Sequence, residues 1–105
     1  MKINIKAKNF ELTPAIKGYV EEKMSYLDRL MSDIHVLGAV SLDFEVGKTT
    51  MHHNKGGVFY AEANLQVPKR IIRAQKTDEN LHAAIDEVKE VLAREVKEYK
   101  ETAGL

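Results

Sequence analysis

The chain of 105 residues contains no cysteine, no tryptophan and only two prolines. Without cysteine it can form neither a disulfide framework nor a thiolate zinc site. No apolar run approaches the ~20 residues that a membrane-spanning helix needs. The alternating start Met-Lys-Ile-Asn-Ile-Lys-Ala-Lys also lacks the unbroken apolar stretch of a secretory signal peptide. These absences favour a cytoplasmic protein with no membrane partner.

The chain also lacks net charge, because 16 Lys and Arg residues balance 16 Asp and Glu residues. Nucleic acids are usually bound by basic proteins, so this sum alone disfavours a nucleic-acid partner. The conclusion depends, however, on where the charges lie. The length predicts one domain over residues 1–105, and a hydrophobic content of 44% is typical of a globular protein.

Hydrophobic periodicity predicts four strands and two helices. Apolar and polar residues alternate in four segments, which predicts strands over residues 2–8, 40–46, 59–67 and 71–76. Thr13-Pro14 is typical of a helix start and predicts a helix over 14–31. Thr77 is expected to cap a second helix over 78–100. The polar stretch 47–57 is expected to form a hairpin loop.

This order, β-α-β-β-β-α, predicts a mixed four-stranded sheet. The helical crossover implies parallel first and second strands, and the short links that follow imply antiparallel hairpins. Each strand has one consistently apolar face, so both helices must cover the same side. The sequence therefore predicts an α+β two-layer sandwich whose other sheet face carries charges of both signs.

Sequence patterns typical of enzymes are absent. The chain has no Gly-x-Gly-x-x-Gly, Walker-type or Gly-x-Ser-x-Gly motif. Of the four histidines, His52 and His53 are adjacent, which in an extended segment directs them to opposite sides. No pair has the i,i+4 spacing that suits a shared metal ion. We therefore predict no enzymatic activity, no metal and no cofactor.

Basic residues follow one edge of the last predicted helix. When the helix is projected at about 100° per residue, Lys89, Lys97 and Lys100 fall on one flank of the apolar stripe. Arg94 and most of the glutamates fall on the back. Ion pairing along the helix and solubility would explain most of this pattern.

Two further basic features allow two interpretations each. Lys23 lies beside the apolar stripe of the first helix, where its stem either covers apolar surface or its ammonium group is held in a groove between the helices. Lys69, Arg70, Arg73 and Lys76 have no acidic residue between them. They form either a binding patch or the charged edge that protects a sheet from aggregation.

The segment from Arg73 to Asp86 reads Arg-Ala-Gln-Lys-Thr-Asp-Glu-Asn-Leu-His-Ala-Ala-Ile-Asp. It resembles the pattern Arg-Ala-Glu-Glu-Thr-x-Glu-Asp-Met-Tyr-Ala-Ala-Ile-Asp of the ribosome hibernation-promoting factor and ribosome-associated inhibitor family, also labelled sigma-factor modulation proteins. Residues 2–5, 12–15, 19–23 and 92–94 resemble the family too. The resemblance covers nearly the whole chain and implies the same β-α-β-β-β-α order.

The resemblance implies a bacterial factor of stress or stationary phase. Such a factor binds the small ribosomal subunit and its ribosomal RNA in the decoding channel and keeps the ribosome idle; DNA is not its partner. It would be either a short form or an N-terminal domain. Whether it promotes ribosome pairing or only blocks translation stays open, as does weak self-association.

The resemblance also implies which basic residues contact RNA phosphates, which would give affinity without sequence readout. Lys17 and Lys23 correspond to basic residues of the family's first helix, and Arg94 and Lys100 to those of its last helix. Lys89 and Lys97 are weaker correspondences. With two residues of the basic segment 69–76, the predicted RNA-binding residues are Lys17, Lys23, Arg73, Lys76, Lys89, Arg94, Lys97 and Lys100.

Some positions depart from the family pattern. His82 replaces the tyrosine, while Tyr26, Val91 and Glu98 stand where family members often carry basic residues. Two other functions therefore stay open: a general module for structured RNA that acts away from the ribosome, and a small oligomeric α+β protein with no RNA partner.

Overall fold

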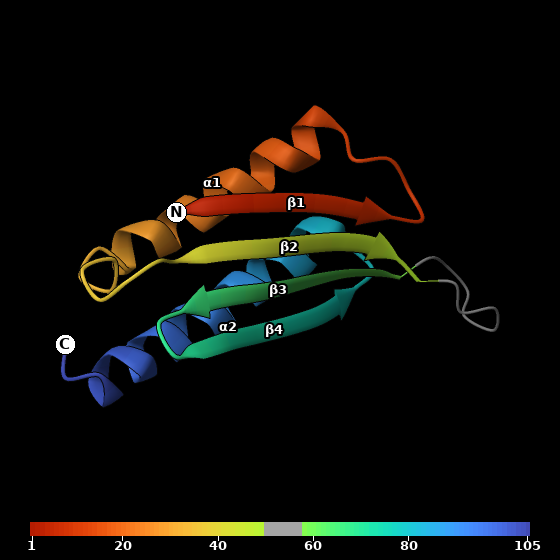
Figure 1. Ribbon diagram of the computed structural model, residues 1–105. Helices are drawn as coiled ribbons and strands as arrows, with labels where there is room; N and C mark the ends of the chain where they lie inside the picture. The colour runs from red at the N-terminus through yellow and green to blue at the C-terminus, as the bar shows by residue number, and fades with distance from the viewer. Residues whose placement is uncertain (50–57) are drawn as a thin grey trace.

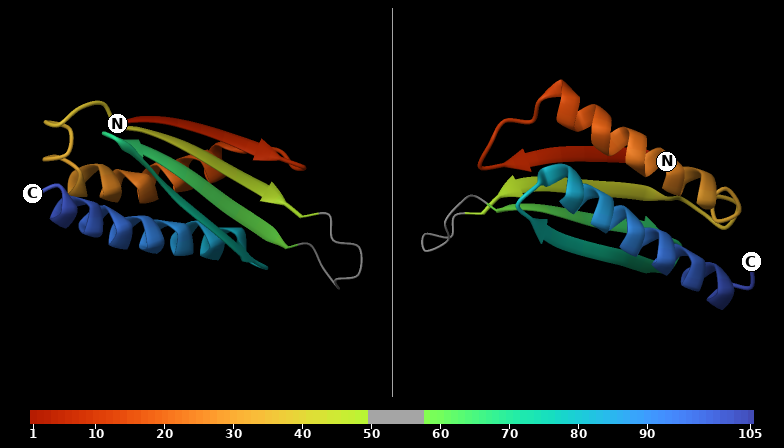
Figure 2. Two further views of the ribbon diagram at one scale, coloured as in Figure 1. Left: turned by 60° about the horizontal axis from the view of Figure 1, so that its bottom comes forward. Right: turned by 180° about the vertical axis from the view of Figure 1, so that it is seen from behind.

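A four-stranded sheet carries both helices on one of its faces (Figures 1 and 2). The computed structural model describes residues 1–49 and 58–105. Its elements are β1 (Lys2–Lys8), α1 (Pro14–Leu30), β2 (Ser41–Lys48), β3 (Phe59–Val67), β4 (Arg70–Asp78) and α2 (Leu81–Thr102). The order β-α-β-β-β-α and the two layers confirm the predicted fold.

The strands lie in the order β1-β2-β3-β4. β1 pairs in parallel with β2, while β2–β3 and β3–β4 are antiparallel. This pairing is as the sequence predicts. β1 and β4 are therefore the edge strands, and each carries exposed basic side chains. Charge on an edge opposes pairing with another chain.

The core lies between the sheet and the two helices. Alternate residues of β2, β3 and β4 point toward the helices and are buried, while residues three or four apart do the same on α1 and α2. No charged residue is buried among those the structure describes. The largest fully buried side chains are Phe44, Met24, Leu27, Met31, Ile34, Leu42, Leu65, Ile72, Ile85 and Leu92.

The second helix begins three residues later than the sequence suggests. Thr77 pairs with Tyr60 in the sheet, so β4 continues to Asp78 instead of ending at residue 76. The residue that caps α2 is Asn80, whose side-chain oxygen accepts a hydrogen bond from the Ala83 amide at 3.1 Å. Asn and Thr both cap helices well. Here Thr77 is part of β4 and cannot cap α2, so Asn80 does.

The expected loop 47–57 is also shorter at its start. Gly47 and Lys48 belong to β2, where they pair with Tyr60 and Phe59 of β3. Residues 50–57, including His52 and His53, lie outside the described part of the chain.

Gly47 has a specific role on the open face of the sheet. The Tyr60 ring lies so close to it that a Cβ atom at this position would overlap the ring. From there the Tyr60 hydroxyl donates a hydrogen bond to Glu45, which also pairs with Lys6 at 3.3 Å.

These contacts shift the pKa values of both Tyr60 and Glu45. Partial burial and the Glu45 carboxylate raise the pKa of Tyr60 to about 12. The hydrogen bond from Tyr60 and the charge of Lys6 lower the pKa of Glu45.

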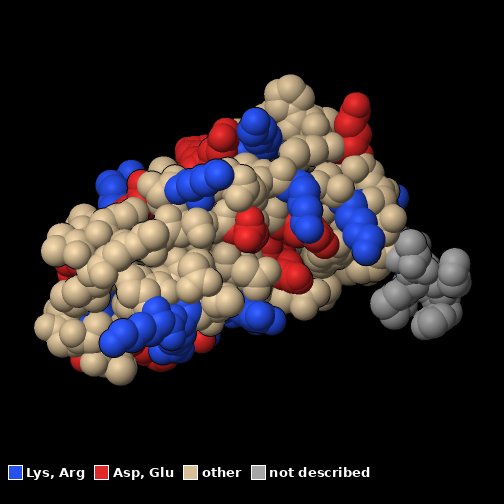
Figure 3. Space-filling view, viewed as in Figure 1, with Lys and Arg blue, Asp and Glu red and all other residues tan. Residues whose placement is uncertain are grey.

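Figure 3 shows this open face, on which acidic and basic side chains alternate without a large area of one sign. The face therefore matches the mixed, solvated surface that the strand patterns predict.

We expect Gly47→Ala to destabilise the fold by about 1–3 kcal/mol, because the new methyl group must displace the Tyr60 ring. Gly18→Ala is the matched control: Gly18 lies in α1 with nothing within 4 Å of an added Cβ. It should stabilise the protein by about 0.5–1 kcal/mol through helix propensity. Urea unfolding measures both variants, and equal effects would contradict this role of Gly47.

Candidate nucleic-acid interface

α1 and α2 lie side by side on the sheet (Figure 2). Basic side chains from both helices contact groups along the line between them. Three lysines, Lys23 of α1 with Lys89 and Lys100 of α2, make up what we call the lysine seam. Their side chains are 22–30% exposed, so their stems are largely covered while their ammonium groups reach the surface.

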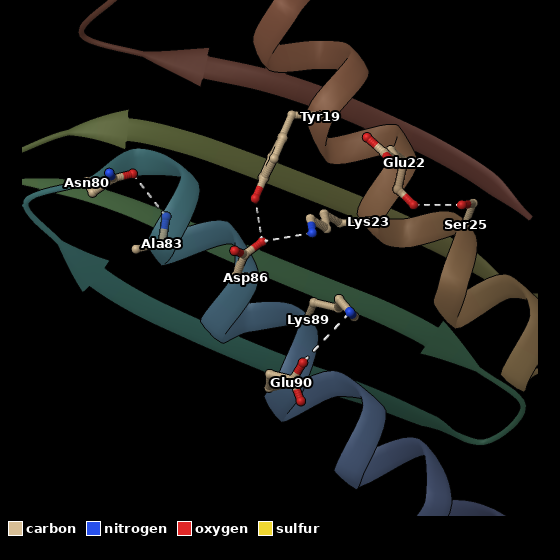
Figure 4. Close-up of polar contacts among 9 residues, drawn as sticks. All are labelled: Tyr19, Glu22, Lys23, Ser25, Asn80, Ala83, Asp86, Lys89 and Glu90. Atoms are coloured by element: carbon tan, nitrogen blue, oxygen red, sulfur yellow. Dashed lines mark hydrogen bonds and ion pairs between the residues drawn. The ribbon is translucent and has the colours of Figure 1, made fainter.

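At one end of the lysine seam, Asp86 joins the two helices (Figure 4). Its Oδ1 accepts a hydrogen bond from the Tyr19 hydroxyl at 2.7 Å and lies 3.6 Å from the Lys23 ammonium nitrogen. That nitrogen is also 5.2 Å from the centroid of the Tyr19 ring, a cation–π distance. Both interpretations of Lys23 therefore apply: its stem is largely covered, and its cation is held between the helices.

The protonation states follow from these contacts. The hydrogen bond to Asp86 raises the pKa of Tyr19, because ionisation would bring two negative charges together. The Asp86 charge raises the pKa of Lys23. Lys23 is therefore a cation at neutral pH.

Helical spacing brings these residues together. Tyr19 and Lys23 are four residues apart on α1, and His82 and Asp86 are four apart on α2, so each pair shares one helix face. The His82 ring meets the Tyr19 ring edge-on, with centroids 4.3 Å apart. His82, one of the residues that depart from the family pattern, therefore contacts Tyr19 at this end of the seam.

The middle of the lysine seam is formed by Lys89. Its ammonium nitrogen lies 4.6 Å from the centroid of the Tyr26 ring and 3.7 Å from a Glu90 oxygen. Tyr26, which stands where family members often carry a base, thus supplies an aromatic surface for a base from the other helix.

The far end of the lysine seam is formed by Lys100. Its ammonium group donates a hydrogen bond to the carbonyl oxygen of Leu30 at 2.9 Å and lies 3.3 Å from Asp33 Oδ1. Leu30 is the last residue of α1. Its carbonyl lacks a partner within the helix, and a cation is favourable at this negative end of the helix dipole.

Arg94, Lys97 and Lys17 are exposed. On α2, the helical spacing places Lys97 on the flank of Lys89 and Lys100, and Arg94 further round the back. Lys17 lies about 120° around α1 from Lys23. Lys17 shares its flank of α1 with Asp28, and Asp28 pairs with the Met1 amino group at the start of β1, not with α2. Lys17 is therefore not part of the lysine seam.

The basic segment 69–76 is one cluster in sequence but not one patch in space. Arg73 pairs with Asn64, and Lys76 pairs with the buried Ala61. The two bases therefore point to opposite faces of β4, with Lys76 on the face of the helices. Lys69 lies in the turn before β4 with a φ of 69°. This arrangement favours the protective role that an edge strand gives to charge.

Sequence reasoning did not identify the residues that hold the lysines: Asp86, Asp33, Tyr19 and Tyr26. The available signal was the spacing of four residues between Tyr19 and Lys23. No spacing rule identifies the two aspartates, because each contacts a lysine that is distant in the sequence. Asp86 of α2 contacts Lys23 of α1, and Asp33, which follows α1, contacts Lys100 of α2.

Within residues 1–49 and 58–105, no group of three His, Asp or Glu side chains is placed to hold a metal ion. Neither helix in this part of the chain combines the length and the apolar character that a membrane span requires.

Comparison with known proteins identifies the family. Residues 3–103 match the model of the family described as sigma 54 modulation protein / S30EA ribosomal protein. The chain belongs to this family. A ribosome hibernation promoting factor of Klebsiella oxytoca is 32% identical over 96% of this chain and 95% of its own length.

Other relatives are longer. A ribosome hibernation promotion factor of Lactococcus lactis is 33% identical over 95% of this chain, but only 50% of its own length is matched. A relative with the same name from Deinococcus radiodurans is matched over 47% of its length. The chain thus spans about half the length of these two curated relatives.

Solved structures share the fold. The N-terminal domain of Protein Y from Thermus thermophilus superposes with a TM-score of 0.76 and 27% identity, covering 94% of this chain and 99% of that domain. A ribosomal subunit interface protein from Coxiella burnetii superposes with a TM-score of 0.68 over 96% of this chain and 99% of its own. At 22% identity, the second comparison supports the fold alone.

We expect Tyr19→Phe to lower the free energy of unfolding by about 1 kcal/mol at pH 7, because the bond to Asp86 is lost. The pKa of Tyr19 is raised in the fold, so this contribution is fully present below the unfolded pKa of ~10 and disappears as the pH rises through the folded pKa. Urea unfolding of both proteins from pH 7 to 11 measures the difference. A difference that stays constant would contradict this role of the hydroxyl.

Proposed function

We propose that residues 1–105 form a ribosome-binding domain that holds ribosomes in an idle state. In this proposal the domain occupies the decoding channel of the small subunit, where messenger RNA and transfer RNA normally lie, under stress or in stationary phase. The observation that carries the proposal is the lysine seam, in which two helices present Lys23, Lys89 and Lys100 along one line. Membership of the family and the names of its relatives support it.

The seam explains how a chain of zero net charge could bind RNA. Lys89 and Lys100 are separated by 11 positions, or about 16 Å along α2, and Lys23 extends the line toward the start of that helix. A structured RNA is recognised largely by shape and backbone, and lysines that contact phosphates supply affinity without reading sequence. The distribution of charge, and not its sum, would therefore determine binding.

The predicted site extends beyond the seam. Lys97 is exposed on the same flank of α2 and could add a phosphate contact next to it, and Lys76 points to the same side of the sheet. Arg94 is exposed further round the back of α2, and we propose it as a contact outside the seam. Lys17 and Arg73 belong to other surfaces, and we propose them only as peripheral contacts.

Several further features belong to the proposal. The domain acts in the cytoplasm, by occupying a site and not by catalysis. It uses no metal or cofactor and binds neither DNA nor a membrane. Its partners are the small ribosomal subunit and ribosomal RNA.

We expect replacement of Lys89 and Lys97 together by Gln to weaken binding to purified small subunits. The slope of log affinity against log salt should become shallower by about 1.4–1.8, since each of the two phosphate contacts contributes ~0.7–0.9. Co-sedimentation across a series of salt concentrations measures both quantities.

The matched control replaces Lys2 and Lys8 by Gln, which removes the same charge from the open face of β1. This control should keep the wild-type salt slope. Equal losses in the two double variants would show that general charge, and not the helix side, determines binding.

A competition experiment tests the location. Small subunits loaded beforehand with messenger RNA and transfer RNA should bind the domain far more weakly than empty subunits, because the ligands would share one channel. Simultaneous binding at full affinity would contradict the decoding channel while retaining the ribosome as partner.

The same measurements distinguish the other two functions. Equal affinity for any structured RNA would indicate a general RNA-binding module. A wild-type domain that stays in the supernatant at every salt concentration would indicate a protein with no ribosomal partner, and sedimentation equilibrium would then show whether it forms oligomers.

A further inference from the structure

We propose that Asp86 and Asp33 are positioning residues for RNA binding. Each carboxylate holds one lysine of the seam between the helices, so that the remaining N–H groups of the ammonium face an incoming phosphate. This inference rests on the proposed function, because it assigns a role to acidic residues within the same RNA-binding surface.

The first contact set fixes Lys23. Its ammonium group has three N–H donors, and only one is needed for the Asp86 oxygen 3.6 Å away. The Tyr19 ring limits the motion of the ammonium group on another side. Asp86 is itself held by the Tyr19 hydroxyl at 2.7 Å (Figure 4). A long, flexible side chain is thus ordered before any RNA arrives.

A second, separate contact set orders Lys100. One of its donors goes to the Leu30 carbonyl oxygen at 2.9 Å, and Asp33 Oδ1 lies 3.3 Å from the ammonium nitrogen. This oxygen atom is buried and accepts no hydrogen bond, so Asp33 acts on Lys100 through charge alone. The side chain of Lys100 is only 25% exposed, so its ammonium group is confined to one place at the end of the seam.

A carboxylate beside a phosphate has two opposite effects. Its negative charge repels the RNA, which would weaken binding. Ordering a lysine in advance removes the entropic cost of immobilising it on binding, which would strengthen binding about two- to tenfold. A phosphate bound to Lys23 would lie within the ~8 Å screening length of Asp86, so the repulsion acts at low salt and weakens as the salt concentration rises, whereas the entropic benefit does not depend on salt. We therefore expect positioning to dominate as the salt concentration rises.

The experiment compares two variants that remove the same charge from neighbouring residues. Asp86→Asn keeps an oxygen that can accept the Tyr19 hydrogen bond but loses the charge that holds Lys23. We expect it to bind small subunits about two- to tenfold more weakly than the wild type, with a deficit that persists as salt rises. Glu87→Gln removes an exposed carboxylate of α2, and we expect unchanged or slightly tighter binding.

A double-variant cycle shows whether Asp86 acts through Lys23. In a Lys23→Gln background, Asp86→Asn should cause no further loss. Tighter binding by Asp86→Asn, or a loss that persists without Lys23, would overturn the proposal.

Thermal unfolding confirms that each variant is folded. The variant Asp33→Asn repeats the test through Lys100 at the other end of the seam. A wild-type domain that fails to bind small subunits would instead overturn the proposed function.

Discussion

The one-sided burial of the sheet is the constraint on which the rest of the structure depends. Alternate residues of β2 to β4 bury one face, so α1 and α2 must both pack on that face and lie next to each other. Side chains such as Lys23 and Lys89, on the helix flanks that meet, cannot enter the core. They are too close to the facing helix to extend freely into water, so they make contacts along the line between the helices.

Those contacts explain how opposite charges are used. The acidic residues near the seam do not simply cancel its lysines. Asp86 and Asp33 each bond or pair with a group on another element and so contribute to holding the helices together. Isolated exposed ion pairs contribute little to stability, but here an aromatic ring or a helix carbonyl adds to each pair. Stability and the presentation of positive charge thus arise from the same contacts.

The sequence was sufficient for the fold because strict alternation and helical periodicity determine which face of each element is buried. The start of α2 was less predictable, since Thr77 and Asn80 are both good caps and only the pairing of β4 with β3 distinguishes them. For the candidate site, helical projection placed Lys89 and Lys100 on one flank and left two interpretations of Lys23. The contacts of Lys23 with Asp86 and of Lys100 with Asp33 depend on the distance between elements, which no local pattern encodes.

The hydrogen bond from Lys100 to the Leu30 carbonyl has a consequence for unfolding. It joins residues 70 positions apart, and it connects the last turn of α2 to the end of α1. A helix terminus normally frays independently of the rest of a protein, because its opening breaks only local contacts. Here the opening of either terminus also breaks a contact with the other helix, so the final turn of α2 and the end of α1 are coupled through this bond.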